Sequence, residues 1–434
     1  MAGTSQLLVA PVHAAGAART AGLSSGMPVR VNSEIGRLRS VIVHTPGAEL
    51  LGVTPSTRED YLYDDLPDAD HARREHGEFV AVLNRFCRVH EVRDLLADVL
   101  ANREVRELLV EKTMDIVPSE PLAREIEALP PAELVRMLVE GRVEQPGPLA
   151  RTLNEAGYEL PPLPNLFFTR DSAMVVGGNV LVGSMRYGSR WPEELIMKAL
   201  FRYHPLLQND GIVFDGSTER RLNYTLEGGD VHAIREDLVV IGFSERSSPG
   251  AIDYVASQLF AHTKVTDIII VVMPREDMAI HLDMIFTQVD RELCVCFPPH
   301  FIGAERLSVL HWRKGRETLS EQRDIFTALE QCGAPMTPIF AGGDRRAVQE
   351  REQWASGCNF VALRPGLVVS YARNGATLRE MERAGFRVVA GTDVVNGLPS
   401  RDDERAVITF DGAELVRGGG GPRCMTCPVE RDEL

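Results

Sequence analysis

Two cysteines near the end of the chain follow a run of glycines, in the segment "GGGGPRCMTCPVERDEL". Cys424 and Cys427 could form half of a zinc site, a redox pair, or a site with one nucleophilic thiol. Cys294 and Cys296 would be the other half of a zinc site, but a Cys-x-Cys pair in an apolar strand points both thiols to one face, which is more typical of buried packing. A thioredoxin-like pair opens a helix after a strand, whereas Pro428 follows directly here. One nucleophilic cysteine is therefore the favoured interpretation, with zinc and redox chemistry as alternatives.

Three aspartates begin segments of similar pattern and could face one cavity. Asp171 follows "NLFFTR", Asp230 closes "LEGGD" and Asp283 closes "HLD". Each aspartate alone could simply cap a turn through hydrogen bonds to backbone amides. Three carboxylates in one cavity would repel each other unless a cation lay between them. Because paired carboxylates bind a guanidinium group in a bidentate geometry, the pattern indicates a planar cationic substrate.

A histidine and a glutamate lie close to these aspartates in the sequence. His281 precedes Asp283 by two residues, and Glu227 precedes Asp230 by three. A single histidine in an apolar stretch such as "MAIHLDM" is more often a core residue than a catalyst. A carboxylate partner would raise its pKa and suit it to acid and base chemistry. We therefore expect His281 and Glu227 to meet at the same cavity as the aspartates.

The glycine run bears on which thiol reacts. The glycines from Gly418 to Gly421 allow backbone and substrate to approach closely. Arg423 and a protonated His281 are expected to favour a thiolate at Cys424 more than at Cys427, which lies three residues further along. A thiolate beside a histidinium attacks planar carbon electrophiles, and the carbon of a guanidinium group is one.

Four segments share the pattern of a short apolar hairpin. They begin at Asp171, Asp230, Asp283 and Asn359, alternate as strands do, turn at Gly-Gly-Asn, Arg-Glu-Asp, Asp-Arg-Glu or Arg-Pro-Gly, and return as an apolar strand. Helical stretches lie between them, and the strand-like segment from Leu38, "LRSVIVHTPG", could form a fifth unit with the glycine-rich tail. The sequence therefore predicts an α/β protein of five ββαβ-like units around an axis. The residues that open the hairpins would then point at one axial cavity.

The pattern changes to helical spacing between residues 95 and 158. Apolar residues recur there every three or four positions with charges between them, and Ser119 with Pro121 has the pattern of an ordinary helix start. We predict a helical insertion without catalytic side chains. The predicted domains are a poorly ordered extension over residues 1–29, a catalytic α/β domain over residues 30–94 and 159–434, and the insertion over residues 95–158.

The composition argues against several classes of partner. The chain of 434 residues has 47 Lys and Arg against 62 Asp and Glu, a net charge of −15, and no basic cluster with aromatic residues, so nucleic acid is not an expected partner. Seven cysteines in a chain of this length predict free thiols in a reducing compartment. No apolar run reaches the length of a membrane span, and the first 26 residues lack the charged start of a signal peptide. We therefore expect a cytoplasmic protein without a membrane partner.

The chain resembles arginine deiminase, a family of the guanidino-group modifying enzyme (pentein) superfamily. The resemblance covers residues 31–430 through "VNSEIGRLRSVIVHTPG", "LPNLFFTRDSAMVVGGNVLVGSM", "LEGGDVHAI", "HLDMIFTQVD" and "RCMTCP". It implies a five-fold pseudosymmetric α/β propeller (pentein) with an inserted all-helical domain. It also implies hydrolysis of L-arginine to L-citrulline and ammonia through a covalent amidino (thiouronium) cysteine intermediate, without metal or organic cofactor. This reaction would be the first step of arginine catabolism by the deiminase pathway, in a homo-oligomer (dimer or tetramer).

The resemblance further implies roles for individual residues. Cys424 would be the nucleophile, and Asp171 and Asp283 would hold the guanidinium group. His281 would act as acid and base, and Glu227 would orient its ring. Two arginines are candidates for binding the substrate carboxylate. The implied substrate-binding residues are Asn165, Phe168, Arg190, Arg246, Asp230 and Gly418.

One position departs from the family pattern, and other activities remain open. Some members have an arginine within the glycine run, where this chain has Gly419, and Arg423 stands next to Cys424 instead. An amidinotransferase or a dimethylarginine hydrolase would use the same cysteine and histidine. A propeller that only binds a partner is a further alternative, although a binding protein has no need of a thiol and its base.

Overall fold

The computed structural model describes residues 28–153, 157–219, 224–275, 279–397 and 404–434. The predicted N-terminal extension lies, up to residue 27, outside the described residues. Val29 is buried, and its N–H donates to the carbonyl of Gln208 over 2.7 Å. The fold therefore includes residue 29, which the predicted boundary had assigned to the extension.

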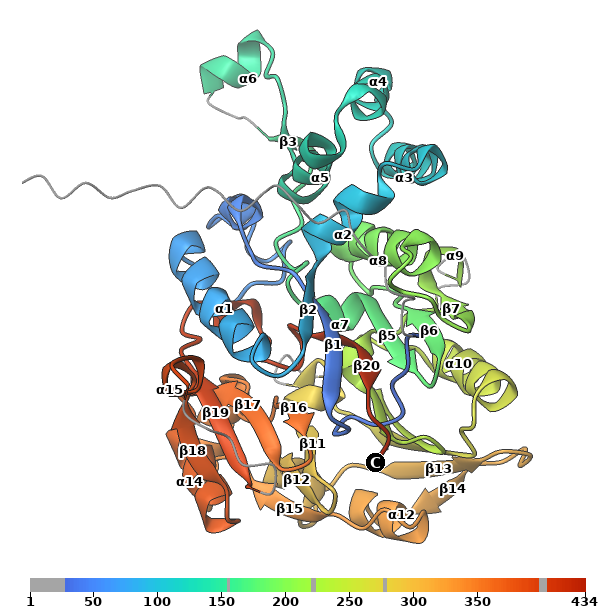
Figure 1. The fold of residues 1–434 in the computed structure, drawn as a ribbon, viewed down its shortest axis with the longest axis vertical. Coiled ribbons are helices and arrows are strands. Elements are labelled where there is room, and N and C mark those ends of the chain that lie inside the picture. The colour runs from blue at the N-terminus through green and yellow to red at the C-terminus, as the bar shows by residue number, and fades with distance from the viewer. Residues whose placement is uncertain (1–27, 154–156, 220–223, 276–278, 398–403) are drawn as a thin grey trace, which may run out of the picture.

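All four predicted hairpins are confirmed as antiparallel strand pairs (Figure 1). Each is nearly or fully buried, and most of its residues are apolar, as expected for strands covered on both sides. Their strands are β5 (Ala173–Val176) with β6 (Asn179–Val182), β8 (Val231–Arg235) with β9 (Leu238–Phe243), β11 (Phe286–Asp290) with β12 (Leu293–Cys296), and β16 (Val361–Arg364) with β17 (Leu367–Tyr371).

Each hairpin is followed by a strand that pairs in parallel with its second strand. A parallel pair requires a crossover connection, and helices make these crossovers. They are α8 (Trp191–Tyr203) before β7 (Gly211–Asp215), α10 (Pro249–His262) before β10 (Asp267–Val272), α12 (Ile325–Gln331) before β15 (Thr337–Phe340), and α14 (Gly375–Arg383) with β18 (Arg387–Ala390) and α15 (Gly391–Val395) before β19 (Ala406–Phe410). Two further strands, β13 (Val309–Arg313) and β14 (Ser320–Gln322), extend the sheet of β8, β9 and β10.

The two ends of the chain meet in one further sheet. Strand β1 (Leu38–Val43) pairs in parallel with β2 (Arg88–Glu91), with α1 (Ala69–Leu83) between them, and antiparallel with β20 (Cys427–Arg431). This confirms the prediction that the N-terminal strand and the glycine-rich tail form one unit. Because β20 begins three residues after Cys424, its pairing with β1 fixes the position of the tail.

The insertion is mostly helical, and its helices project beyond the strands at one end of the molecule (Figure 1). The predicted start of a helix at Ser119 is confirmed, since its hydroxyl accepts from the N–H of Leu122. The expectation of an all-helical insertion is wrong, because a short strand pair closes it. Gly141 ends the preceding helix at φ +78°, where a Cβ would lie 2.5 Å from the carbonyl of Leu160. The elements are α2 (Val92–Val99), α3 (Arg103–Ile116), α4 (Glu120–Ala128), α5 (Pro131–Glu140), β3 (Arg142–Val143), α6 (Pro148–Leu153) and β4 (Tyr158–Leu160).

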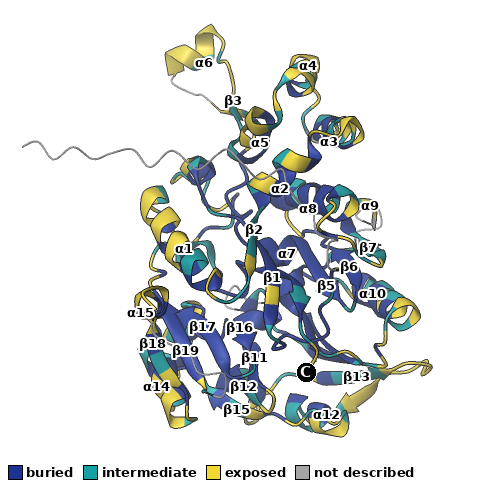
Figure 2. Ribbon diagram, viewed as in Figure 1, coloured by how far each residue is buried: buried dark blue, intermediate teal, exposed yellow. Residues whose placement is uncertain are grey.

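The insertion shares its apolar core with the neighbouring sheet. Leu96 and Leu134 of the insertion belong to one buried cluster with Leu200 of α8 and with Ala173 and Val180 of the β5–β6 hairpin. In Figure 2 the central strands are buried, whereas the outer faces of α1, α4 and α6 are exposed. The insertion therefore packs as a continuation of the fold.

Short helical turns complete the structure, and several of them directly precede a hairpin. They are η1 (Ala48–Gly52), α7 (Thr169–Ser172), η2 (Gly188–Arg190), α9 (Gly216–Glu219), η4 (Gly228–Asp230), η6 (Leu282–Met284), α11 (Pro298–Phe301), α13 (Arg346–Trp354) and η7 (Leu415–Gly418).

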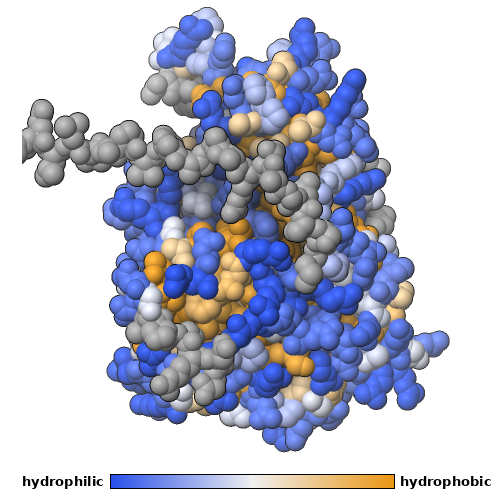
Figure 3. All heavy atoms as spheres, viewed as in Figure 1, coloured by the Kyte–Doolittle hydropathy of each residue, from blue (hydrophilic) through white to orange (hydrophobic). Residues whose placement is uncertain are grey.

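Hydrophilic side chains cover most of the face shown in Figure 3. Among the described residues, no helix combines the length and the apolar composition that a membrane span requires.

Candidate active site

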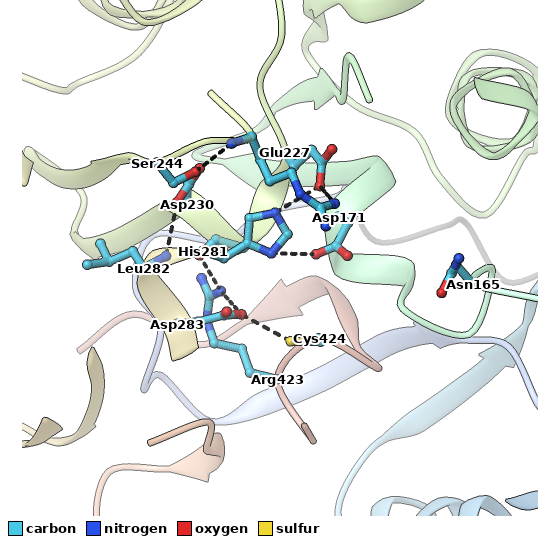
Figure 4. Close-up of polar contacts among 12 residues, drawn as sticks. Asn165, Asp171, Glu227, Asp230, Ser244, His281, Leu282, Asp283, Arg423 and Cys424 are labelled. Atoms are coloured by element: carbon cyan, nitrogen blue, oxygen red, sulfur yellow. Dashed lines mark hydrogen bonds and ion pairs between the residues drawn. The ribbon is translucent and has the colours of Figure 1, made fainter. Parts of the chain in front are cut away.

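Three helical turns hold the three predicted aspartates at matching places. Asp171 lies in α7 before β5, Asp230 lies in η4 before β8, and Asp283 lies in η6 before β11. All three side chains are buried. The repeated turn before each hairpin therefore brings acids far apart in the sequence to one region of the fold (Figure 4).

A cavity of about 390 Å³ lies where these turns meet the glycine-rich tail. None of the described residues between 95 and 158 lines it, which agrees with an insertion that supplies no catalytic side chain. Glu227, Asp230 and Asp283 are not among its lining residues either. The predicted residues that do line it are Asn165, Phe168, Asp171, Arg190, Arg246, His281, Gly418 and Cys424.

His281 is held between two carboxylates. Its Nε2 lies 2.8 Å from Glu227 Oε2, and its Nδ1 lies 3.7 Å from Asp171 Oδ1. Burial would lower the pKa of His281, but Asp171 and Glu227 outweigh burial and raise this pKa to about 9. The predicted pairing of His281 with Glu227 is therefore present, and the imidazole is a proton donor at neutral pH. Gly229 allows the ring to lie here, because a Cβ at this position would be 2.5 Å from Nδ1.

Glu227 is fully buried, and its carboxylate is the charged partner of His281 Nε2. Burial would raise its pKa, but Arg246, His281 and Arg190 lower it. One of its oxygens accepts from the backbone N–H of Arg186 over 2.9 Å. Glu227 thus fixes the ring of His281 from behind the cavity.

The sulfur of Cys424 lies against acids and an amide. Its Sγ is 3.4 Å from Asp283 Oδ2, and Asn359 Nδ2 donates to it over 3.1 Å. Burial and the carboxylates of Asp283 and Asp171 raise the pKa of Cys424 well above its ordinary value. The expectation of a thiolate favoured by Arg423 is therefore wrong for the empty site, in which the sulfur is a protonated thiol.

Arg423 binds two carboxylates beneath the site. Its Nη1 donates to Asp283 Oδ2 over 2.9 Å, and its Nη2 and Nε donate to Glu34 over 3.1 and 3.2 Å. The side chain is fully buried. These ion pairs hold Asp283 in place, and the charge of Arg423 lowers the pKa of Cys424 less than burial, Asp283 and Asp171 raise it.

Asp230 does not line the cavity, and protein groups donate to both of its oxygens, whereas Asp171 and Asp283 each keep one buried oxygen without a donor. The prediction that Asp230 binds substrate is therefore wrong. One of its oxygens accepts from the hydroxyls of Ser244, over 2.6 Å, and of Ser247, and the other accepts from the N–H of Leu282 over 2.9 Å. Burial raises the pKa of Asp230 to about 6, against these hydrogen bonds. Asp230 ties the segment after β9 to the turn that holds His281 and therefore supports the site from outside it.

Arg190 and Arg246 line the cavity but are paired with acids of the protein. Arg190 donates to Asp171 Oδ2 over 2.8 Å and to both oxygens of Glu193. Arg246 donates to Glu227 Oε2 over 3.3 Å, and its guanidinium lies 4.7 Å from the centre of the Tyr187 ring. Both cations are thus fixed in place before any ligand enters.

The glycine-rich tail packs on an aromatic wall of the cavity. A Cβ on Gly420 would lie 2.4 Å from the ring of Phe168, and one on Gly418 would lie 2.9 Å from it. The amide nitrogen of Asn165, on the same loop, donates to the carbonyl of Tyr61 over 2.7 Å. Glycine is required here because the tail backbone touches the ring directly.

Two residues of the site were missed by sequence reasoning. Asn359 accepts from the N–H groups of Arg423 and Cys424 and donates to Cys424 Sγ. It opens the fourth hairpin, as the aspartates open the others, so the repeat itself was a signal for it. Glu34 had no comparable signal, because it precedes the first strand of the fold and meets Arg423 across 389 residues of sequence.

The cysteines considered for a zinc or redox site lie in surroundings unlike those of Cys424. Cys427 lies in β20, where its thiol donates to the carbonyl of Ala173, and burial raises its pKa to about 12. Cys294 and Cys296 are buried in β12 within an apolar cluster. None of these three cysteines belongs to a group of possible metal ligands among the described residues.

Asp171, Glu227 and His281 lie close enough together to hold a metal ion. Arg190 pairs with Asp171 and Arg246 pairs with Glu227, so cations of the protein already bind the two carboxylates. The site suits an organic cation better, since its remaining acceptors are carboxylate oxygens beside a thiol.

The comparisons with known proteins agree with this arrangement. The sequence model of the arginine deiminase family matches residues 59–431. An arginine deiminase of Listeria welshimeri is 32% identical over 427 residues, which cover 94% of this chain and 99% of the relative. One from Rhodococcus erythropolis is 30% identical over 429 residues, which cover 95% and 99%. The solved structure of SxtG, an amidinotransferase from Microseira wollei, has a similar fold with a TM-score of 0.51 at 12% identity, over 94% of this chain and 98% of SxtG. This chain belongs to the arginine deiminase family.

Proposed function

We propose that the protein is an arginine deiminase, which hydrolyses L-arginine to L-citrulline and ammonia. The observation that carries the proposal is the position of Cys424 Sγ, 3.4 Å from Asp283 Oδ2, in a cavity lined also by Asp171 and His281. A thiol, an imidazolium and two carboxylates are the groups that attack on a guanidinium carbon needs. The curated relatives named above are arginine deiminases.

Two buried oxygens support a carboxylate clamp for the guanidinium group. Asp171 Oδ1 and Asp283 Oδ1 have no hydrogen-bond partner, while the other oxygen of each is bound by Arg190 or Arg423. A buried acceptor without a donor destabilises the protein by about 1–3 kcal/mol. The N–H groups of a guanidinium would satisfy both oxygens, and the two arginines would hold the carboxylates in place to receive them.

Substrate binding would also activate the nucleophile. The carboxylates of Asp171 and Asp283 contribute to the raised pKa of Cys424 in the empty site. A guanidinium between them would neutralise these charges, so the thiol would release its proton to water once the substrate is bound. The thiolate would then form where it is needed, next to the guanidinium carbon.

The reaction would proceed in two steps. The Cys424 thiolate forms a bond to the guanidinium carbon, the bond from this carbon to a terminal nitrogen breaks, and His281 donates its proton to the departing ammonia. Neutral His281 then takes a proton from water, which attacks the thiouronium carbon. The bond from carbon to sulfur breaks and the remaining hydroxyl proton passes to solvent, which yields neutral citrulline and returns the thiolate beside a protonated His281. Positioning by the clamp and proton transfer by His281 each contribute to the rate, the latter by about 100-fold or more.

The finer features of the family are part of the same proposal. The sheets would surround one axis as a five-fold pseudosymmetric α/β propeller with the helical insertion attached, and the domains would follow the predicted boundaries apart from residue 29. Arg190 and Arg246 would bind the substrate carboxylate. The enzyme would act in the cytoplasm as a homo-oligomer, without cofactor, nucleic acid or membrane partner, in the first step of arginine catabolism.

Product analysis separates this activity from its closest alternatives. Purified protein is incubated with L-arginine, with L-arginine plus glycine, and with dimethylarginine, and the products are quantified after dialysis against a chelator. We expect citrulline and ammonia in equal amounts from L-arginine, unchanged by glycine. Guanidinoacetate formed in the presence of glycine would indicate an amidinotransferase, and faster turnover of dimethylarginine would indicate a dimethylarginine hydrolase.

A further inference from the structure

A second group of polar side chains lies outside the cavity, at the edge of the five-stranded sheet. Asp267 begins β10, His311 lies on the adjacent strand β13, and Cys332 ends α12. His311 Nε2 is 2.7 Å from Asp267 Oδ1 and 3.6 Å from Cys332 Sγ, and all three donor atoms lie within 4.8 Å of one another. None of the three residues lines the active-site cavity.

We propose that Asp267, His311 and Cys332 bind a thiophilic divalent cation such as Zn²⁺. Carboxylate, imidazole and thiolate are the three ligand types that zinc takes from proteins, and one oxygen, one nitrogen and one sulfur converge here. A catalytic triad would need both ring nitrogens of the histidine, whereas the same nitrogen of His311 faces both partners. Convergence of three donor atoms on one point is the geometry of a metal site.

The distances fit a tetrahedral ion after a small movement. With bonds of about 2.0–2.1 Å to nitrogen and oxygen and about 2.3 Å to sulfur, zinc holds nitrogen and sulfur ligands about 3.5 Å apart and nitrogen and oxygen ligands about 3.3 Å apart. The distance from His311 to Cys332 is already 3.6 Å. The distance from His311 to Asp267 is 2.7 Å, so it would open by about 0.6 Å, by rotation of the carboxylate.

The surroundings hold the ligands and still admit an ion. Arg235 donates to the carbonyls of Cys332 and Gly333, and therefore fixes the turn that bears the thiol, while Asp237 neutralises its charge. The side chains of His311 and Asp267 are 11% and 13% exposed, so solvent reaches the group, and water would be the fourth ligand. Arg313 also donates to Asp267 Oδ1, but its own side chain is 58% exposed and is free to swing aside.

Binding would join the end of α12 to the edge of the sheet. The Cys332 thiol would release its proton to water when the sulfur–metal bond forms, and no oxidant or further reactant is needed. Since an ion that binds only the folded state stabilises it, the metal should raise the melting temperature.

Cobalt is the probe, because a thiolate bound to Co²⁺ gives a charge-transfer band in the near ultraviolet. Wild-type protein is titrated with Co²⁺ at neutral pH, and Zn²⁺ is then added as competitor. We expect the band to saturate at one equivalent, to disappear on addition of Zn²⁺, and to accompany a rise in melting temperature. Absence of the band in the folded wild-type protein would overturn the proposal.

Variants assign the band to this group of residues. Cys332→Ser and His311→Ala should lose the band and the metal-dependent rise in melting temperature, while circular dichroism checks that they fold. Cys87→Ser is the matched control, because Cys87 is the other partly buried cysteine and its thiol donates only to the carbonyl of Leu83. Cys424→Ala should keep the band as well. A band that persists in Cys332→Ser and vanishes in Cys424→Ala would place the ion in the active site and contradict the proposal.

Discussion

Cys424 lies among acids, and this shapes the chemistry that the proposed enzyme can perform. Its sulfur contacts Asp283 and Asn359, while Arg423 is occupied by Glu34 and Asp283. Because burial and the carboxylates of Asp283 and Asp171 raise the pKa of Cys424, a cation between these carboxylates would favour the thiolate. Such a site would favour guanidinium substrates over neutral electrophiles, which bring no positive charge to the sulfur.

The pKa of His281 is expected to set the upper pH limit of the reaction. The pKa of His281 is raised to about 9, so the imidazolium that protonates ammonia is lost as the pH rises through this value. We expect kcat to fall above pH 9 in a profile measured at saturating arginine. Glu227→Gln should move this fall to lower pH, because it removes one of the carboxylates that raise the pKa. A fall centred near the ordinary histidine value of about 6.5 in the wild type would contradict the assignment.

The same shift has a consequence for stability. Because the pKa of His281 is higher in the folded than in the unfolded chain, the imidazolium stabilises the fold fully below about pH 6.5. This contribution disappears as the pH rises through about 9. Heat denaturation of the wild type should therefore show a loss of stability over this range that His281→Ala lacks.

Asp283→Asn tests the clamp. The change keeps the size of the side chain but removes the charge opposite the guanidinium, so kcat/KM should fall by orders of magnitude. Arg423 keeps Glu34 as a partner, so the fold should survive. Asp290→Asn is the control, since Asp290 ends β11, the strand that follows the turn with Asp283, and binds Arg405 instead. Near wild-type turnover of Asp283→Asn with an unchanged melting temperature would rule out this role.

Among the elements, the glycine-rich tail lines part of the cavity with residues that have no side chain, Gly418, Gly419 and Gly420. Its position comes from β20, which pairs with β1, and from direct contact with Phe168. Side chains are absent where the tail meets the ring, so the thiol of Cys424 can approach a planar substrate closely.

Gly420→Ala should disturb this contact. The added methyl group would lie 2.4 Å from the buried Phe168 ring, so the ring or the tail must move. Because small misplacements at a reacting centre are costly, we expect kcat/KM to fall by roughly tenfold or more. Gly77→Ala is the matched control: its Cβ meets nothing within 4 Å on the exposed side of α1, and it should leave kcat/KM unchanged. Equal kinetics in the two variants would show that the contact does not matter.

The elements that could be predicted from the sequence are those marked by a pattern of neighbouring residues. The hairpins from Asp171 to Asn359 combine short apolar runs with turns at polar or glycine residues, so their strands are predictable from the sequence. The direction of a side chain in the turn before a strand follows no such period, which is why Asp230 was placed in the cavity. The partner of Arg423 depends on the whole fold, since Glu34 reaches it from the opposite end of the chain.

At the scale of the whole molecule, the insertion is joined to the rest of the fold through a shared core. Its helices pack on α8, but its last helix, α6, is largely exposed. Leu149 is 71% exposed and Leu153 is 61% exposed. None of its described residues lines the active-site cavity. The insertion can therefore vary in surface contacts while the cavity stays intact.

Limited proteolysis tests this division. We expect the first cuts near the C-terminal border of the insertion, around α6, because its exposed backbone opens at little cost in free energy. The nicked protein should retain citrulline formation as long as its fragments remain together. Earlier cuts within "DSAMVV" or "HLDMIF", which are buried, would contradict the division.

The proposed mechanism requires Cys424 as the nucleophile and gives Cys427 no catalytic role, and the mass of the acid-quenched enzyme during turnover of L-arginine tests this requirement. We expect an amidino adduct on the peptide that contains Cys424, present in Cys427→Ala and absent in Cys424→Ala. Citrulline formation should be lost in Cys424→Ala and survive in Cys427→Ala, since Cys427 lies in β20 and does not line the cavity. Loss of activity in both variants, together with stoichiometric zinc that neither variant retains, would contradict this mechanism and favour a metal site formed by the two cysteines.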